Sequence, residues 1–161
     1  MDFEIAPFDL SHKPQVLELS LRAWAPVFAA LKPAVPDHVY EAFYPRGWRV
    51  RQTSDIEAFL DSSGDRAWVA IRDSAVLGWI GIRLHPQDRM GEIYILAVDP
   101  THQRRGIGEA LIDFALERMR AAGMLIAMAE TGDDPGHSAS RATYESSGFE
   151  RWPVARYFRK L

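Results

Sequence analysis

The 161-residue sequence contains no cysteine, which excludes disulfide bonds, thiolate metal ligands and a cysteine nucleophile. No apolar run approaches the ~18 residues that a transmembrane helix needs, so no membrane association is expected. The N-terminal stretch MDFEIAPFDL lacks the basic and apolar regions of a signal peptide, which favours a cytoplasmic location. The formal net charge of −3 argues against a nucleic-acid-binding protein, because such proteins are usually basic.

The composition that remains is that of an ordinary globular protein, with 47% apolar and 25% charged residues. The sequence has no internal repeat and no linker that would divide it. Its length suits one domain that buries most of its apolar surface. We therefore expect a single domain over residues 1–161.

A short strand and three helices are expected in the N-terminal part of the chain. The strand covers residues 3–8, and the helices cover residues 15–31, 37–44 and 54–61. Pro26 lies inside the first helix, so a kink or a break is expected there. Ser54 and Glu57 have the spacing of a capping box, which predicts that the third helix begins at Ser54.

Strands and helices alternate in the rest of the chain. An apolar stripe from Ile107 to Met119 predicts a helix that ends near Gly123, and a second helix is expected over residues 138–146. The predicted strands cover residues 67–71, 76–84, 92–98, 125–129 and 156–160. This order indicates a mixed α/β fold in which an antiparallel meander precedes right-handed crossover units.

Two glycines stand at the start of the helix that follows strand 92–98, after the polar segment Gln103-Arg104-Arg105. Glycine weakens a helix by roughly 1 kcal/mol relative to alanine, so another requirement must favour Gly106 and Gly108. The first turn of a helix presents unpaired N–H groups and the positive end of the helix dipole. Bare backbone lets an anion approach these groups, and a pyrophosphate fits this arrangement.

Comparison with known phosphate-binding motifs excludes two classes of nucleotide site for this segment. No Gly-Lys-Ser/Thr follows, which excludes the P-loop, and Leu111 stands where dinucleotide-binding folds have their third glycine. The remaining pattern, Gln103-x-x-Gly106-x-Gly108, resembles the signature of the GNAT acetyltransferase superfamily. The segments LAVDPTHQRRGIGEALI and ATYESSGFE also resemble the strand–turn–helix and the later helix and strand of that family. The N-terminal part of the chain resembles the family in layout only.

The resemblance implies a GNAT-like acyl-CoA N-acyltransferase fold, whose mostly antiparallel central sheet of about six to seven strands is flanked by helices. It also implies acetyl-CoA as co-substrate. The pantetheine arm would pair with the backbone of strand 92–98, the pyrophosphate would contact the amides of residues 104–109, and Arg104 and Arg105 could reach the 3′-phosphate. The residues expected to bind the cofactor are Leu96, Ala97, Val98, Gln103, Arg104, Arg105, Gly106, Ile107, Gly108, Glu109 and His137.

Tyr144 and Glu92 are the candidates for catalysis. By resemblance, Tyr144 would protonate the departing thiolate, a role that suits a phenol with a pKa near 10. Glu92 is the only charged side chain in the run 92–98. It matches the general-base glutamate of the histone-acetylating branch of the family. In the alternative interpretation, Tyr144 packs on the sheet, Glu92 faces solvent or pairs with an arginine, and a water chain removes the proton.

His137 stands where the family often has an asparagine that caps the following helix. Histidine caps poorly, so Asp134 or Ser138 is expected to cap instead. His137 itself either contacts the cofactor, acts as a base or is an ordinary loop residue. The other histidines show no metal-ligand spacing, so no metal is predicted.

The acceptor is expected to be an amine. In the family, the first helices and the loop between them form the acceptor pocket. Here that region contains Trp24, Phe28, Tyr40, Phe43, Tyr44 and Trp48. These aromatic residues either line an acceptor site or pack in the core, and Asp37 and Glu41 would suit a cationic amine. Aminoglycosides, polyamines, amino acids, peptide N-termini and lysine side chains are all compatible with this sequence.

We therefore predict an N-acetyltransferase that transfers the acetyl group of acetyl-CoA directly to a primary amine of a small molecule or peptide. The alternative is a non-catalytic acyl-CoA-binding sensor or interaction module. Tyr144 beside a phosphate-binding turn favours the enzyme, because a sensor needs no acid. Nucleic acids and membranes are not expected as partners, and a homodimer is compatible with the sequence.

Overall fold

The computed structural model describes residues 2–161, which form five strands and five α helices. The strands are β1 (Glu4–Pro7), β2 (Ala67–Arg72), β3 (Ala75–His85), β4 (Met90–Val98) and β5 (Ile126–Ala129). The helices are α1 (Lys13–Leu31), α2 (Asp37–Phe43), α3 (Trp48–Ser63), α4 (Ile107–Ala121) and α5 (Ser138–Ser146).

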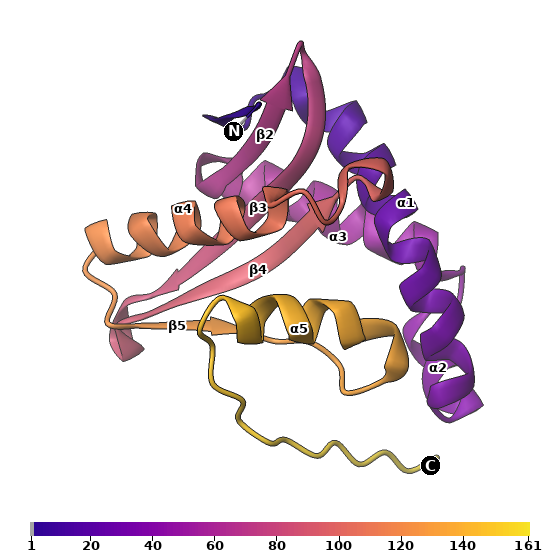
Figure 1. The fold of residues 1–161 in the computed structure, drawn as a ribbon. Helices are drawn as coiled ribbons and strands as arrows, with labels where there is room; N and C mark the ends of the chain where they lie inside the picture. Colours follow the sequence, from indigo (N-terminus) through magenta and orange to yellow (C-terminus); the bar gives the residue numbers. More distant parts are fainter. Residues whose placement is uncertain (1) are drawn as a thin grey trace.

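The strands form one sheet in the order β1-β2-β3-β4-β5 (Figure 1). Neighbouring strands are antiparallel from β1 to β4, whereas β5 is parallel to β4. A tight turn at Asp73 and Ser74 joins β2 to β3, and α4 connects β4 to β5. The predicted fold class, a mixed α/β fold with a mostly antiparallel sheet, is confirmed.

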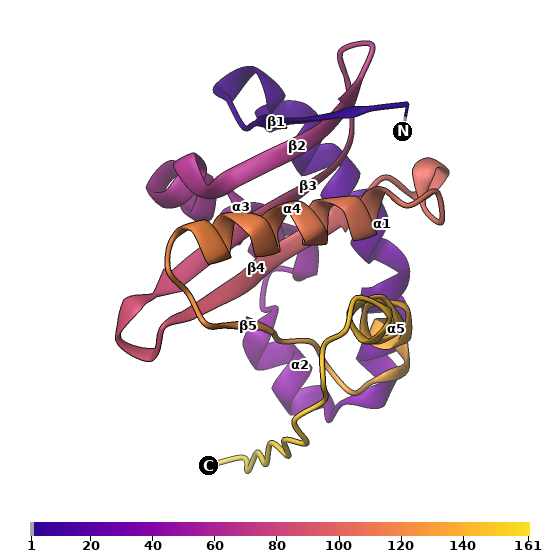
Figure 2. The same cartoon turned by 60° about the vertical axis from the view of Figure 1, so that its left-hand side comes forward.

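Helices cover both faces of the sheet. On one face, α1 and α3 pack around the buried Trp79, whose indole N–H donates to Ser20 Oγ at 2.7 Å. On the other face, α4 buries its apolar stripe against β3 and β4. Figure 2 shows α4 on the near side of the sheet with α1 behind it. Both faces of β3 and β4 are therefore covered, which explains why these strands read as nearly continuous apolar runs.

The structure differs from the predictions at two points in the N-terminal helices. α1 runs through Pro26 as one helix, so the break, one of the two expected alternatives, is absent. Buried residues on both sides of the proline, Ala23 and Phe28, hold the helix in place. Their burial outweighs the hydrogen bond that a proline cannot make. α3 begins at Trp48, after Gly47 with a φ of +88°, so Ser54 lies inside the helix and forms no capping box.

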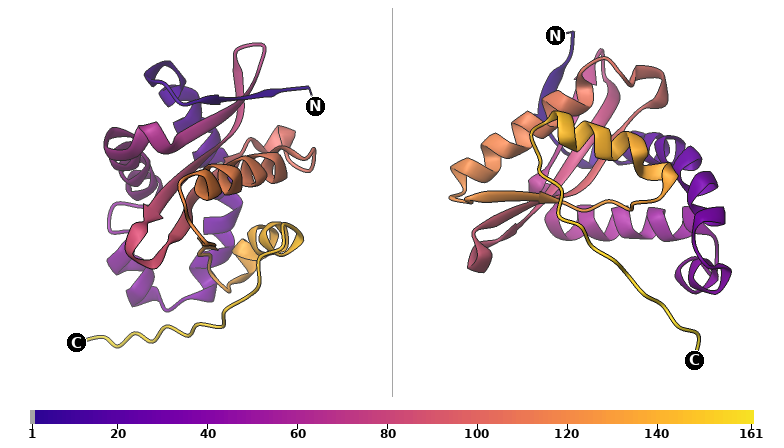
Figure 3. Two further views of the ribbon diagram at one scale, coloured as in Figure 1. Left: turned by 90° about the vertical axis from the view of Figure 1, so that its left-hand side faces the viewer. Right: turned by 60° about the horizontal axis from the view of Figure 1, so that its bottom comes forward.

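The sheet has five strands rather than six to seven, because residues 147–161 form no strand. The strand predicted over residues 156–160 is therefore wrong. Figure 3 shows this segment leaving α5 as an extended trace, and ion pairs of Arg151 with Asp133 and of Arg156 with Glu130 hold it beside the loop after β5. Strand-like composition is not sufficient, since a strand also has to pair, and this segment does not pair with the open edge of β5.

Candidate functional site

β4 is paired over its full length along one edge but only partly along the other. On the β3 side, pairing extends from Met90 to Val98, whereas β5 pairs with β4 only from Met90 to Ile93. Beyond Ile93 the two strands diverge, as Figure 1 shows. The β5-side edge of residues 94–98 therefore has no strand partner within the described chain, and the predicted residues Leu96, Ala97 and Val98 lie in this stretch.

A buried hydroxyl follows the end of β5. Thr131 Oγ1 has no hydrogen-bond partner within residues 2–161, and β5 ends two residues earlier at Ala129. An unpaired buried polar group destabilises a protein by ~1–3 kcal/mol. A polar ligand bound at this end of the diverging strands would supply the missing partner.

Hydrogen bonds and an ion pair fix the turn that follows β4. The Asp99 carboxylate accepts from the amide of Thr101 at 2.9 Å and from its hydroxyl at 2.6 Å, and it pairs with Arg22 of α1. Burial alone would raise the pKa of Asp99, but these partners outweigh it and lower the pKa to about 2. Gln103 Nε2 donates to the Val98 carbonyl at 3.0 Å and so connects the turn to the end of β4.

The start of α4 presents bare backbone. Its N-cap, Gly106, has a φ of +79°, and no side chain caps the first-turn amides. The N–H groups of Ile107, Gly108 and Glu109 therefore remain available to an anion. A Cβ at Gly108 would lie 3.7 Å from Val98, an ordinary contact, so the protein itself does not require glycine there. The space left by the missing side chain lies beside the end of β4.

The two predicted arginines of the turn lie in different settings. Both are exposed, and Arg104 has a φ of +60°, which is unfavourable for a residue with a side chain. Arg105 lines a small hollow together with Arg72 and His102, whereas Arg104 does not. The turn thus adds two positive charges near the start of α4, in two directions.

Tyr144 of α5 packs in the same apolar cluster as Ile93, Leu96 and Val98. Its ring meets Phe149 edge to face, with a centroid distance of 5.5 Å. Burial raises the pKa of Tyr144 to about 12. The phenol therefore stays protonated near neutral pH, and it lies on the face of the sheet that α4 and α5 cover.

Glu92 forms a close pair with His85, whose Nε2 lies 2.8 Å from the Glu92 carboxylate. The two residues are diagonal neighbours across the β3–β4 pairing, because His85 lies opposite Met90. A Cβ at Gly91 would meet Met119 of α4, and Ile93 packs in the α4 cluster. Glu92, between them, faces the opposite side of the sheet. The candidate acid and base therefore lie on different faces of β4.

His137 is the N-cap residue of α5 but makes no capping hydrogen bond. Its Nδ1 lies 2.6 Å from the Asp134 carboxylate, which also accepts from the Gly136 amide at 2.9 Å. Asp134 therefore caps the short turn η6 (Pro135–His137) that leads into α5, and not α5 itself as expected, and it orients the imidazole of His137.

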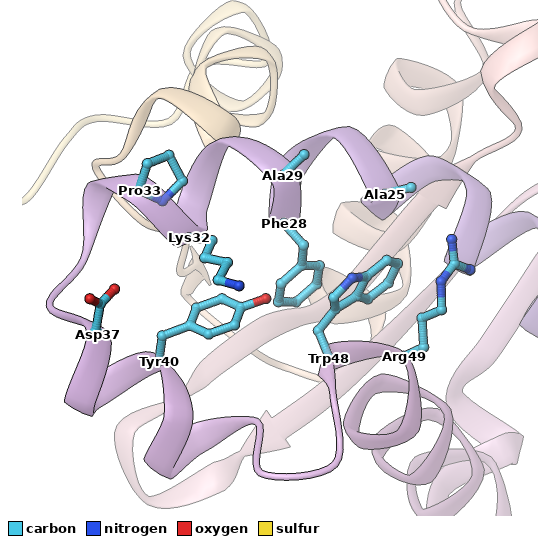
Figure 4. Close-up of a pocket in the computed structure, with 9 residues that line it drawn as sticks. All are labelled: Ala25, Phe28, Ala29, Lys32, Pro33, Asp37, Tyr40, Trp48 and Arg49. Carbon is cyan, nitrogen blue, oxygen red and sulfur yellow. The ribbon is translucent and has the colours of Figure 1, made fainter.

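A cavity of about 580 Å³ lies among α1, α2 and α3 (Figure 4). Phe28 and Trp48 stack at a centroid distance of 4.5 Å, and Tyr40 completes the aromatic wall. Charged groups ring this wall: Lys32 lies 5.7 Å from the Tyr40 ring centre and Arg49 lies 4.7 Å from that of Trp48. The complete lining is Ala25, Phe28, Ala29, Lys32, Pro33, Asp37, Tyr40, Trp48 and Arg49.

The other aromatic residues of the N-terminal helices do not line this cavity. Trp24 packs against the core beneath α1, and Tyr44 packs edge to face on Phe28 at 5.2 Å. Phe43 is exposed and contacts Phe158, and Glu41 is exposed as well. None of the predicted cofactor-binding or catalytic residues lines the cavity, so any acceptor bound there would lie apart from the turn before α4.

The described part of the chain contains neither a cluster of metal-ligating side chains nor a helix suited to cross a membrane. No group of three or more His, Asp or Glu side chains among residues 2–161 could hold a metal ion. Within the same residues, none of the helices is both long enough and apolar enough to cross a membrane.

Comparison with known proteins identifies the family of this fold and turn. The sequence model of the acetyltransferase (GNAT) family matches residues 33–149. The chain belongs to this family. Mycothiol acetyltransferase of Kocuria rhizophila is 33% identical over 113 residues, which cover 67% of this chain and 37% of the relative. That of Beutenbergia cavernae is 42% identical over 83 residues, 52% of this chain and 26% of the relative. This GNAT chain therefore spans about a third or less of the length of these curated relatives.

Solved structures resemble the GNAT fold described above. The PaiA N-acetyltransferase from Thermoplasma acidophilum, in complex with coenzyme A, matches with a TM-score of 0.70 at 18% identity, over 96% of this chain and 94% of that one. The ribosomal-protein-S18-alanine N-acetyltransferase from Escherichia coli matches with a TM-score of 0.65 at 18% identity, over 94% and 79% of the two chains. At this identity the likeness establishes the fold.

The sequence patterns did not predict three residues of the site. Arg22 was one of many charged helix residues, and nothing nearby in the sequence pairs it with Asp99. His85 lies just beyond the predicted strand 76–84, and only the β3–β4 register places it diagonal to Glu92. No sequence pattern marks Thr131 as a site residue, because the burial and lack of a partner of its hydroxyl arise only in the packed structure.

Proposed function

We propose that this chain is an N-acetyltransferase that transfers the acetyl group of acetyl-CoA to a primary amine. Membership of the acetyltransferase (GNAT) family supports the proposal, as do relatives named mycothiol acetyltransferase and structural neighbours named N-acetyltransferases. The observation that carries it is the one-sided pairing of residues 94–98, directly before a turn that presents uncapped backbone amides.

The free edge and the turn together fit the two halves of acetyl-CoA. An amide-bearing pantetheine arm can add to Leu96, Ala97 and Val98 as a strand adds to a sheet edge. The pyrophosphate can then meet the amides of Ile107, Gly108 and Glu109 at the start of α4. Gln103 would position the end of β4, and Arg104 and Arg105 would supply positive charge. The unpaired Thr131 hydroxyl supports a ligand between the diverging strands.

In the proposed reaction, the amine nitrogen attacks the thioester carbonyl, a C–N bond forms and the C–S bond breaks. The amine loses one proton and the departing sulfur gains one. We assign the second proton transfer to Tyr144, whose raised pKa keeps it protonated near neutral pH. We assign the removal of the amine proton to Glu92, directly or through water. Glu92 pairs with His85, and Glu92 lies on the face of β4 opposite to Tyr144.

We propose the aromatic cavity of about 580 Å³ as the region that binds the body of the acceptor. Its aromatic wall suits an apolar or ring-bearing amine, and Asp37 provides one carboxylate for a positively charged group. His137, which Asp134 orients, is proposed as a cofactor contact. A homodimer and a cytoplasmic location stay predictions from the sequence.

The test measures release of free thiol from acetyl-CoA with a panel of amines, using reactions without amine as the baseline. Calorimetry with CoA supplies the matched binding measurement. Turnover with at least one amine class is expected. Binding of CoA without turnover on any amine would favour the alternative, a non-catalytic acyl-CoA-binding module, and absence of CoA binding would refute both.

Glu92→Gln tests the proposed base while keeping a group that can hydrogen-bond to His85. If Glu92 removes the proton, kcat/KM should fall by about 10²-fold and the acidic limb of its pH profile should disappear. His85→Gln is the companion variant, since it alters the partner and leaves the carboxylate. A Glu92→Gln profile that matches the parent would assign proton removal to water.

A further inference from the structure

A small hollow lies on the β3 side of the turn before α4, away from β5. It has a volume of about 140 Å³ and is lined by Asp2, Phe3, Arg72, Leu77, His102, Arg105 and Ile107. A water molecule occupies ~30 Å³ in the liquid, so the hollow can take a phosphate group but not a nucleoside. Ile107 is the first residue of α4, which places the hollow next to the proposed pyrophosphate site.

Basic groups from three separate segments converge on this hollow. Arg72 comes from the end of β2, His102 from the short turn η5 (Pro100–His102), and Arg105 from the turn before α4. The Arg72 Nη2 atom lies 3.4 Å from His102 Nε2. Because a guanidinium has only donors, this contact requires a lone pair on His102 Nε2. An anion in the hollow would accept from Arg72 and Arg105 and offset their positive charge, whereas His102 Nε2, as an acceptor, positions Arg72.

One carboxylate accompanies these groups. Asp2 lies 3.3 Å from Arg72 Nη1, but its side chain is 92% exposed. Such an exposed ion pair contributes ~0–1 kcal/mol, so a bound phosphate can replace it at little cost. The other side of His102 is held in place, because its Nδ1 lies 2.9 Å from the Thr101 hydroxyl within the Asp99 network. The hollow is therefore partly organised before any ligand binds.

We infer that Arg72 and Arg105, with His102 positioning Arg72, form the subsite for the 3′-phosphate of CoA. This inference rests on the proposed function, and it deepens it by adding two residues outside the glycine motif. A phosphate monoester there would lie on the opposite side of the turn from the pantetheine arm, with the pyrophosphate between them. Arg104, which does not line the hollow, has no part in this subsite.

Calorimetry with CoA and with 3′-dephospho-CoA tests the inference, because the two ligands differ only in this phosphate. The parent is expected to bind CoA about tenfold more tightly or better, as charge-assisted hydrogen bonds to phosphate provide. Arg72→Gln and Arg105→Gln should each weaken CoA binding, leave 3′-dephospho-CoA binding largely unchanged and bring the ratio close to one. Arg72→Lys should retain part of the preference, and Asp2→Asn should increase it.

Two arginine variants serve as controls for the loss of one positive charge. Arg120→Gln, in the last turn of α4, should change neither affinity, and Arg104→Gln should leave the ratio of the two affinities unchanged. Melting temperatures establish that each variant is folded. A parent that binds both ligands equally, or an Arg72→Gln protein that keeps the full preference, overturns the inference. Either result leaves the proposed function standing if 3′-dephospho-CoA still binds, whereas failure to bind either ligand refutes both.

Discussion

The turn before α4 and the cavity among α1, α2 and α3 offer a ligand different parts of the chain. The turn offers backbone: the uncapped amides of α4, the free edge of residues 94–98 and the space at Gly108. The cavity offers side chains, with three aromatic rings surrounded by Lys32, Asp37 and Arg49. Backbone groups are the same whatever the sequence, whereas an aromatic wall changes with each substitution.

This difference indicates which of the two regions can change its ligand specificity between related enzymes. A site made of amides needs small residues and a fixed turn, so it suits a ligand that never changes, such as the proposed acetyl-CoA. A site made of side chains can be altered without disturbing the sheet, so it suits the ligand that differs between related enzymes. Mutations in the two regions should therefore affect different kinetic constants.

Tyr144→Phe should produce the largest effect, and it should alter neither region's binding. The substitution removes one hydroxyl and keeps the ring that packs on Phe149. General acid catalysis contributes about 10²–10⁴-fold, so kcat should fall by that factor with unchanged affinity for acetyl-CoA. Thiol release, calorimetry and melting temperature measure the three quantities. If kcat of the variant stays within about threefold of the parent value, Tyr144 is not the general acid.

Gly108→Val should affect only the turn. The added side chain fills the space beside Val98 and keeps the pyrophosphate from the amides of α4. We expect acetyl-CoA to bind at least about tenfold more weakly, with an unchanged KM for the amine. Gly108→Ala is the matched control, with a smaller loss because its side chain is one methyl group. If folded Gly108→Val binds acetyl-CoA as tightly as the parent, the turn before α4 does not bind the pyrophosphate. The proposed division of ligands between the turn and the cavity would then be wrong.

Trp48→Ala should affect only the cavity, which makes it the counterpart of Gly108→Val. It removes half of the Phe28–Trp48 stack and should raise KM for the amine several-fold, about what one lost aromatic contact provides. The KM for acetyl-CoA should not change. Trp48→Phe keeps a stacking ring and should stay near the parent. If the variants alter acetyl-CoA and amine constants together, the two regions are not independent.

The smallest expected effect is on the free energy of unfolding at acidic pH. It tests the ion pair between Arg22 of α1 and Asp99 at the turn, which connects the helices of the cavity to the turn before α4. The folded-state pKa of Asp99 is lowered to about 2. The unfolded chain therefore takes up this proton first as the pH falls. The ionised Asp99, with its hydrogen bonds from Thr101 and its ion pair with Arg22, should contribute about 2 kcal/mol above pH ~4, and this contribution should be lost between pH ~4 and ~2. Urea unfolding of the parent and of Asp99→Asn measures the difference, and parallel pH curves would refute the assignment.

The C-terminal half of the chain was the more predictable one. β2, β3, β4, α4 and α5 lie where their periodicity and turn residues place them, because each is a regular element bounded by glycine or a turn. In the N-terminal half, the polar segment before Ser54 concealed the start of α3, and Pro26 suggested a break that burial prevents. Tertiary packing overrode the local signal in both cases. It also left residues 156–160 unpaired, although their composition suits a strand.

The glycine turn, the strand before it and the apolar stripe of α4 could be predicted from the sequence, since these depend on interactions between residues close in the chain. The same residues identified the family. Packing of distant segments was needed to show that β5 leaves β4 after Ile93, that His85 meets Glu92, and that Arg22 reaches Asp99. It likewise brought Arg72, His102 and Arg105 around one hollow. These contacts join segments far apart in the chain or depend on strand register, and no local pattern encodes such distances.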